Sequence, residues 1–184
     1  MPDFTFPVND VVAGIFTVLG LDYPAEDTDV GSITVYDTDG SVKATRTIRG
    51  SGSGPIRRHF ERSDKYFPLV HVDWEVDPEP QRMGVFGRLV TATYWVYLVD
   101  VKLPVADISP NPYICTETFA WALQRLIEAN WAYLGTDYKL AAEVGEPTRK
   151  NPWEEHNEER NASRIAYAFR VDTSARYLLP EVVS

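Results

Sequence analysis

A stretch in which apolar and polar residues alternate constrains the fold of this chain more than any other feature. From Leu89 to Val99, one set of alternate positions is apolar, namely Val90, Ala92, Tyr94, Val96 and Leu98, and the other set includes Thr91, Thr93 and Tyr97. A period of two predicts a β-strand with one face in the core and the other face wet or shared with a partner. The segment from Ile165 to Val171 repeats this alternation, with small and basic residues on its polar side.

Two other segments have the apolar spacing of amphipathic helices. We expect the first helix to run from Asp10 to about Leu21, and the second, longer helix to run from Thr116 or Thr118 to Leu134. The first has the apolar stripe Val11, Val12, Ile15, Phe16 and Leu19, and the second has Phe119, Leu123, Leu126, Ile127, Trp131 and Leu134.

A hairpin and one more strand complete the expected sheet. The segments 33–36 and 42–48 flank the Asp39–Gly40 pair, which favours a tight turn, and we expect this hairpin to be an exposed flap or an edge. The segment 66–74 alternates like a strand. Two connections are long: we expect 77–87 to be a projecting loop and 136–161 to be an irregular, acidic contact segment.

These elements predict an α+β fold. We expect a mostly antiparallel, twisted β-sheet that packs against the N-terminal helix and the long amphipathic helix, with a projecting β-hairpin and long loops. The length of 184 residues suits a single domain, 1–184, with a core of about 9–171 and a C-terminal tail of 172–184. The residues expected to be buried together are Val70, Val72, Val90, Tyr94, Val96, Leu123, Ile127, Tyr167 and Phe169.

Composition narrows the classes of function. The net charge of -9 argues against extensive wrapping by nucleic acid, because each phosphate contact needs a cation. No apolar run approaches the ~20 residues that cross a bilayer, so we expect no membrane partner. The single cysteine, Cys115, fits synthesis in a reducing cytoplasm.

The charge is unevenly distributed, and this gives candidate interface residues. Arginines gather around a glycine-rich segment, and glutamates gather near residue 155; the tail is apolar. The candidate interface residues are Arg46, Arg49, Arg57, Arg58 and Arg62, then Glu154, Glu155 and Glu158, then Tyr177, Leu178 and Leu179. Loops of opposite charge can join copies of one chain head to tail, and the alternative is that both loops are merely solvated.

The chain has few of the residue patterns that catalysis needs. His71 and Asp73 share one strand face and could form an acid/base pair, but a hydrogen-bonded structural histidine is the commoner case. Cys115 precedes a helix without a neighbouring base, which favours a buried thiol over a nucleophile. Glu154, Glu155 and His156 lack the spacing of a metal site. We therefore expect no enzymatic activity, no metal and no cofactor.

The order of the elements resembles the tail terminator, or tail completion, proteins of long-tailed bacteriophages. The resemblance covers about Asn9 to Val171 and includes a helix, a hairpin, a basic loop, the strand Phe67-Pro-Leu-Val-His-Val-Asp-Trp, the strand Arg88-Leu-Val-Thr-Ala-Thr-Tyr-Trp-Val-Tyr-Leu-Val, a helix and a last strand. The resemblance depends on the order of these elements and not on a diagnostic sequence motif.

The resemblance implies a structural protein of the virion, in the tail or neck, made in the host cytoplasm. Members of the family form a hexameric ring that caps the tail tube and performs head-tail joining. The implied partners are other copies of the chain, the tail tube protein and a head-tail connector protein, with DNA passing through the lumen. The acidic segment 136–161 and the apolar tail depart from the smallest members, which leaves a head-tail connector, a stopper or a tail tube protein as alternatives. A small monomeric ligand-binding domain and an unfamiliar α+β enzyme are the alternatives from other classes.

Overall fold

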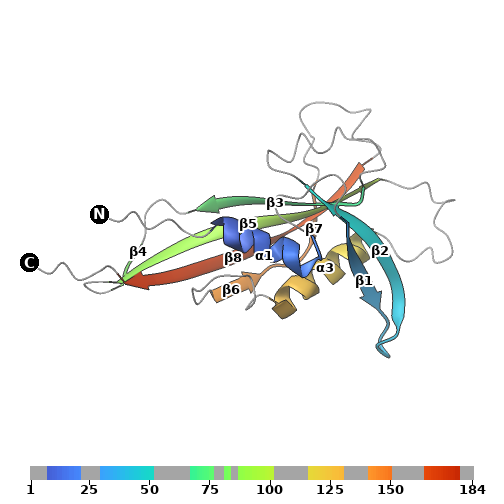
Figure 1. Ribbon diagram of the computed structural model, residues 1–184, viewed down its shortest axis with the longest axis horizontal. Helices are drawn as coiled ribbons and strands as arrows, with labels where there is room; N and C mark the ends of the chain where they lie inside the picture. Colours follow the sequence, from blue (N-terminus) through green and yellow to red (C-terminus); the bar gives the residue numbers. More distant parts are fainter. Residues whose placement is uncertain are drawn as a thin grey trace, which may run out of the picture.

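The computed structural model describes residues 8–21, 30–51, 67–76, 81–83, 87–101, 116–130, 141–150 and 164–178. These residues form two helices and eight strands (Figure 1). The helices are α1 (Val8–Val18) and α3 (Thr116–Asn130). The strands are β1 (Gly31–Tyr36), β2 (Val42–Gly50), β3 (Leu69–Val76), β4 (Gln81–Met83), β5 (Gly87–Val101), β6 (Ala141–Val144), β7 (Thr148–Lys150) and β8 (Arg164–Leu178).

The strands form one mixed sheet. Its order is β1-β2-β3-β5-β8-β6, while β4 also pairs with β5 and β7 also pairs with β8. All pairings are antiparallel except that of β2 with β3, which joins Arg49 to Leu69 and Gly50 to Val70 in parallel. The predicted α+β class is confirmed, and the sheet is mostly antiparallel as expected.

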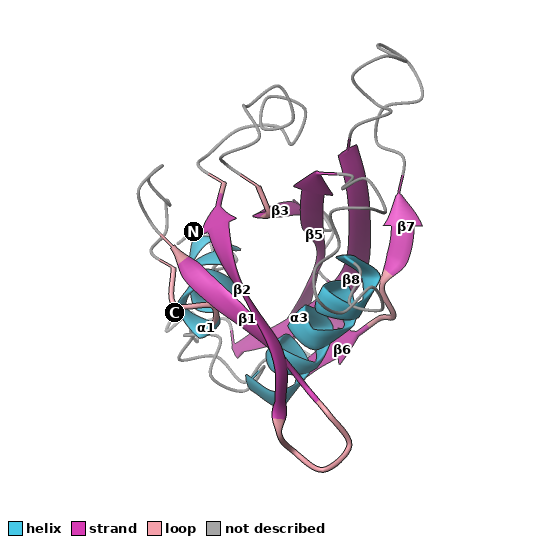
Figure 2. Ribbon diagram, turned by 90° about the vertical axis from the view of Figure 1, so that its right-hand side faces the viewer, coloured by secondary structure: helices cyan, strands magenta, loops and turns pink. Residues whose placement is uncertain are grey.

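The sheet curls around the two helices (Figure 2), and the main core lies between them. The buried cluster contains the predicted residues Val70, Val72, Tyr94, Val96, Leu123, Ile127 and Phe169, with Tyr167 packed against it. The side chain of Val90 lies outside the described residues. The alternation on β5 is confirmed, because Ala92, Tyr94, Val96 and Leu98 are each at most 2% exposed.

The outer face of the sheet is only partly exposed to solvent. At one end, Leu69, Val99 and Ala166 form a second, smaller buried cluster, against which Phe67 and Tyr97 pack. Further along β5, Thr91 and Thr93 are half-buried. The expectation of one wet or shared face on β5 therefore applies to its middle, while the Val99 end is covered by the chain's own side chains.

Helix α1 begins two residues before the predicted Asp10 and ends at Val18, three residues before the predicted Leu21. Gly20 has a φ of 71°, a left-handed conformation that favours glycine. The N–H of Leu21 donates to the carbonyl of Phe16 at 3.0 Å, and that of Gly20 donates to Thr17 at 2.9 Å. These two bonds form a Schellman motif that closes the helix. The whole predicted stripe of α1 is buried, with no member more than 2% exposed.

The predicted hairpin is confirmed as β1 and β2, and its turn uses Gly40 with a φ of 82°. Asp39 accepts hydrogen bonds from the Ser41 hydroxyl at 2.6 Å and from the Ser41 N–H at 2.9 Å. These bonds lower the pKa of the Asp39 carboxyl below its ordinary value. The tip is exposed, but Ile33 and Ile48 at its base are buried in the core, so the hairpin is not a free flap.

Three expectations about connections are wrong. The segment 77–87 is not only a loop, because β4 pairs with β5 within it, and 136–161 contains β6 and β7, both paired with β8. The tail does not begin at 172, since β8 continues to Leu178 beside β5. In each case the local alternation of apolar and polar residues is weak, and pairing with a 15-residue strand, β5 or β8, stabilises the short or extended strand instead.

Candidate functional site

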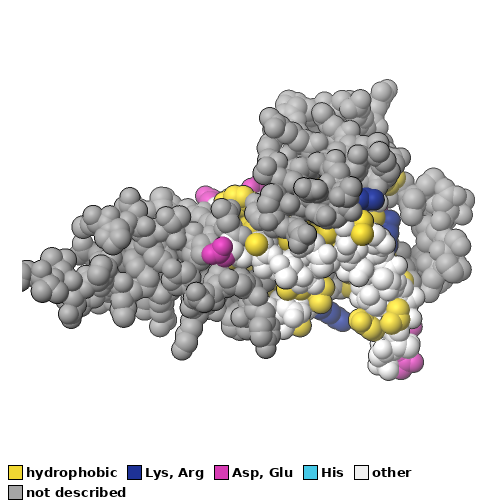
Figure 3. Space-filling view, in the orientation of Figure 1, with side chains coloured by type: hydrophobic (Ala, Val, Ile, Leu, Met, Phe, Trp, Pro, Cys, Tyr) yellow, Lys and Arg dark blue, Asp and Glu magenta, His cyan; other side chains and the backbone are white. Residues whose placement is uncertain are grey.

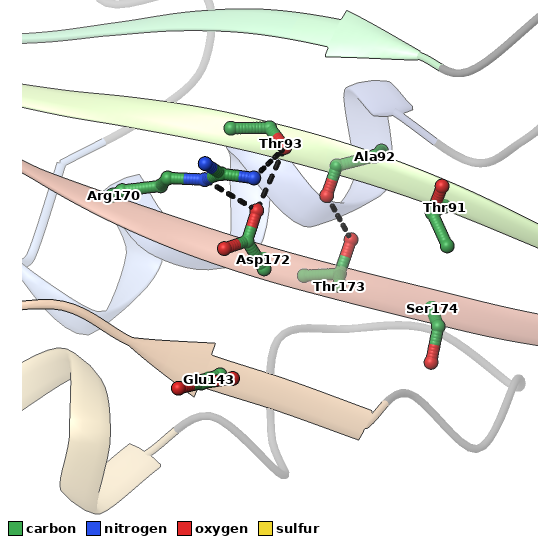
Figure 4. Close-up of a pocket in the computed structure, with 8 residues that line it drawn as sticks. All are labelled: Thr91, Ala92, Thr93, Glu143, Arg170, Asp172, Thr173 and Ser174. Atoms are coloured by element: carbon green, nitrogen blue, oxygen red, sulfur yellow. Dashed lines mark hydrogen bonds and ion pairs between the residues drawn. The ribbon is translucent and has the colours of Figure 1, made fainter.

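A polar cavity of about 550 Å³ lies where β5, β8 and β6 run side by side (Figure 4). Thr93 on β5 stands opposite Asp172 on β8, and Asp172 stands opposite Glu143 on β6. Opposed residues of neighbouring strands have Cβ atoms about 5 Å apart, so the three polar side chains form one row across the sheet. Hydroxyls from Thr91 and Ser174 line the same cavity.

Hydrogen bonds hold the centre of this cavity in place. Asp172 Oδ1 accepts from Arg170 Nε at 2.7 Å and from Thr93 Oγ1 at 2.7 Å, while Arg170 Nη2 lies 3.3 Å from the same threonine hydroxyl. Figure 4 shows these three side chains directed toward one another. The Arg170 and Asp172 side chains are 52% and 40% exposed, so this ion pair adds little to the free energy of folding.

The described residues that line the cavity offer polar binding groups, and the carboxylate that contacts the Thr93 hydroxyl, that of Asp172, is already paired with Arg170. The side chains of the cavity are hydroxyls, carboxylates, one guanidinium and one methyl group, and none of the lining residues is a histidine or a cysteine. A serine or threonine hydroxyl needs an adjacent base to become a nucleophile. The arrangement is suited to binding a polar group.

A second polar cluster connects three elements inside the molecule. Asp100 on β5 accepts hydrogen bonds from both terminal nitrogens of Arg46 on β2 and from the Thr116 hydroxyl at the start of α3. The Arg46 guanidinium also lies over the Phe119 ring, 5.7 Å from its centroid. The Asp100 side chain is only 2% exposed, so its charge is compensated within the chain.

A third polar contact joins Ser51 to His71. Ser51 Oγ lies 2.6 Å from His71 Nδ1, and both residues are at most 3% exposed. Asp73, the expected acid/base partner, is exposed, and one of its oxygens accepts from the N–H of Trp74. Burial of Tyr97 is the larger cause that raises the pKa of its hydroxyl, and the negative charge of Asp73 is the smaller one. His71 is thus a buried, hydrogen-bonded sheet residue, as in the commoner of the two interpretations.

The structure separates the candidate interface residues predicted from sequence. Arg46 binds Asp100 within the chain, and Arg49 is half-buried on β2 beside Leu69 of β3. Tyr177 and Leu178 belong to β8 and stand opposite Arg88 and Gly87 of β5. The remaining candidates, Arg57, Arg58, Arg62, Glu154, Glu155, Glu158 and Leu179, lie outside the described residues, as do Cys115, His59 and His156.

Sequence reasoning missed the two clusters centred on Asp100 and Asp172. The available signal was a single carboxylate within each apolar strand pattern, because a charge in such a position needs a partner. Within the described ranges, no three histidine, cysteine or acidic side chains converge as metal ligands. In the same part of the chain, no helix has the length and apolar character to span a membrane.

Comparison of the chain with protein-family models and with curated proteins finds no match.

Proposed function

We propose that this chain is a structural subunit of a phage virion, similar to the tail terminator proteins. In this role six copies form a ring that caps the tail tube and joins the tail to the head. The observation that supports the proposal most is the element order from α1 to β8, which contains the helices and strands of the resemblance in the same sequence, with the short strands β4, β6 and β7 in addition. The function requires assembly and no catalysis.

The shape of the sheet is compatible with a ring. A closed ring needs heterologous contacts, in which two different surfaces of one chain meet. Among the described strands, β1 is the edge at one end of the sheet, while β5 and β8 extend away from it as a long pair toward the other end (Figure 1). Two such different surfaces can meet in neighbouring copies without competing.

The main competing function is that of a monomeric ligand-binding domain. The polar cavity around Arg170 and Asp172 favours this alternative, because a guanidinium and several hydroxyls can bind an anionic or hydroxylated ligand. Such a domain would remain one chain in solution at every concentration.

Light scattering across a concentration series, with and without a tail tube subunit, distinguishes the two functions. The tail terminator role predicts a species near six chains, and negative-stain images of concentrated protein should contain rings. A mass of one chain under both conditions would contradict the proposal and favour the ligand-binding domain. A connector or tail tube protein would instead form rings that do not stop the growth of tail tubes.

A further inference from the structure

A groove runs along the outer edge of β1, beside α3. Its volume is about 790 Å³, and every residue from Ser32 to Thr38 lines it. Consecutive strand residues point to opposite faces, so a groove lined by all of them follows the strand's edge and not one face. Among the described strands, β1 pairs only with β2. Alternate N–H and C=O groups of β1 are therefore directed toward the groove.

One face of α3 forms the other wall. Trp121, Arg125 and Leu126 lie on it at helical spacing, together with the small residues Ala122 and Ala129. Trp121 and Leu126 are half-buried, and Arg125 is exposed. In Figure 3, hydrophobic and basic side chains occur close together over α3 and the β1–β2 hairpin. An edge strand beside an apolar helix face is the geometry that accepts an extended segment as an added strand.

The charge of the groove narrows the choice of occupant. Lys43 and Asp37 at one end form an ion pair of 3.2 Å and neutralise each other. Arg125 has no carboxylate partner among the described residues, and it leaves the groove with a positive charge. An apolar segment with one carboxylate therefore fits both the lining and the charge.

We propose that this groove binds residues 179–184 of a second copy of the chain as an added β-strand. The segment reads Leu-Pro-Glu-Val-Val-Ser, so it supplies apolar side chains and one carboxylate, Glu181, for Arg125. It directly follows β8, which is already extended. Pro180 is tolerated, because an added outermost strand pairs along only one of its edges.

The same chain cannot fill its own groove. β8 ends at Leu178, at the end of the molecule opposite to the β1–β2 hairpin (Figure 1). Gly50 lies level with Tyr167, because Gly50 pairs with Val70, Val70 with Leu98, and Leu98 with Tyr167. Ile48, at the base of the hairpin, lies two residues farther from Leu178 and is therefore level with Ile165. From Ile165 to Leu178 the strand rises about 43 Å, whereas six extended residues span at most about 20 Å. The contact is therefore between copies and heterologous.

The test uses two variants of the full chain and one matched control. The groove variant is Tyr36→Glu/Ala129→Glu, at two exposed positions that line the groove. The tail variant is Val182→Asp/Val183→Asp. The control is Val42→Glu: Val42 is 62% exposed and stands opposite Tyr36 on β2, but it does not line the groove. Thermal melts check that each variant folds, and Arg125→Glu replaces the groove variant if that one does not.

Sedimentation velocity is measured at about 0.5 M salt, where charged loops are screened beyond about 4 Å. The wild-type chain and the control should associate with the same affinity. The groove variant and the tail variant should each associate with an affinity lower by about tenfold or more. An equimolar mixture of the groove and tail variants should form a species of two chains and no larger one, because it contains one intact groove for each intact tail.

Three results would overturn the inference. A tail variant that associates like the wild type means that the occupant is another segment of the second copy. A mixture that gains no mass means that groove and tail do not meet. A wild-type chain that remains monomeric means that the occupant is a different protein. The inference depends on the groove and not on the virion role. Rings formed by the tail variant would contradict only the inference. A mixture of the groove and tail variants that forms the two-chain species, together with a wild-type chain that forms no rings, would contradict only the proposed function.

Discussion

Arg46 on β2 donates hydrogen bonds from both terminal nitrogens of its guanidinium to the carboxylate of Asp100 on β5, whose side chain is only 2% exposed. The two residues are 54 positions apart, and β3 lies between their strands in the sheet. Since the Thr116 hydroxyl of α3 donates to the same carboxylate at 3.1 Å, one buried charge connects the hairpin, the central sheet and the long helix. This cluster fixes the position of the hairpin that forms one wall of the groove.

Replacing one partner of this pair should destabilise the fold. Arg46→Met leaves the Asp100 charge buried without its cation, and we expect a loss of about 2–4 kcal/mol in the free energy of unfolding, measured by urea denaturation. The double variant Arg46→Met/Asp100→Leu removes the charge as well and should recover part of that loss. A double variant that is as unstable as the sum of both single variants would contradict this account.

Val96 tests the position of the core. It is 0% exposed, so Val96→Asp places an unpaired carboxylate among apolar side chains and should abolish the cooperative thermal transition. Val42 is 62% exposed, and Val42→Asp should melt within a few degrees of the wild type. Circular dichroism melts of both variants provide the comparison, and similar melts would mean that the assigned strand face is wrong.

The charged segments outside the described residues provide a prediction about assembly. Arg57 and Arg58 can make charge-assisted contacts to Glu154 and Glu155 of a neighbouring copy. Arg57→Glu/Arg58→Glu should then weaken assembly in light scattering without a change in the melting temperature, and added salt should have the same effect on the wild type. Equal assembly of both proteins at low and high salt would favour loops that are merely solvated.

The sequence predicts the elements that have strong local periodicity. The stripe of α1 and the alternation of β5 lie on the predicted faces because each depends on side chains within one element. β4, β6 and β7 have three or four residues each, too few for a period to be recognised, and their pairing with β5 or β8 defines them. The extension of β8 to Leu178 likewise depends on its partner, since β5 provides backbone hydrogen bonds as far as Gly87.

The candidate sites were harder to predict because they depend on contacts between distant residues. A sequence pattern identifies Arg46 as a surface cation, whereas the fold places it beside Asp100. The groove likewise combines an edge strand with a helix 80 or more positions away, and no local pattern relates Tyr36 to Trp121. A charge embedded in an apolar strand, as at Asp100 and Asp172, is the one local signal that indicates such a cluster in advance.

Two glycines should differ in their tolerance of alanine. A Cβ atom at Gly31 would collide with the backbone carbonyl oxygen of Leu19, whereas a Cβ atom at Gly40 would meet nothing within 4 Å. Gly40→Ala therefore carries only the conformational cost of a φ of 82°, about 1 kcal/mol. Gly31 has no such φ, but Gly31→Ala must move the Leu19 carbonyl at the end of α1 away from β1 and should cost more in urea denaturation. Equal costs would contradict this close approach.

Tyr94 should make the stability of the fold depend on alkaline pH. Burial raises the pKa of its hydroxyl above the ordinary value of 10.0, so above about pH 10 the unfolded chain releases this proton while the folded chain retains it. The free energy of unfolding should therefore fall as the pH rises above 10, and it should be unaffected by this group below that pH. The nearby Thr173 hydroxyl, which has a smaller and opposite effect on this pKa, donates to the Ala92 carbonyl, so among the described residues the Tyr94 hydroxyl forms no strong hydrogen bond. Tyr94→Phe should therefore change the stability at pH 7 by less than about 1 kcal/mol.

The measurement for this prediction is urea denaturation of the wild type and Tyr94→Phe between pH 7 and pH 11. Tyr94→Phe should lose less stability than the wild type over this range, although Tyr97, whose pKa burial also raises, leaves a residual dependence in both proteins. Tyr36→Phe is the control, because Tyr36 is 61% exposed and its ring is solvated in both states. If the three proteins lose stability in parallel above pH 10, the Tyr94 hydroxyl does not carry the alkaline transition, and the interior beside β5 must admit water or a hydrogen-bond donor that stabilises the phenolate.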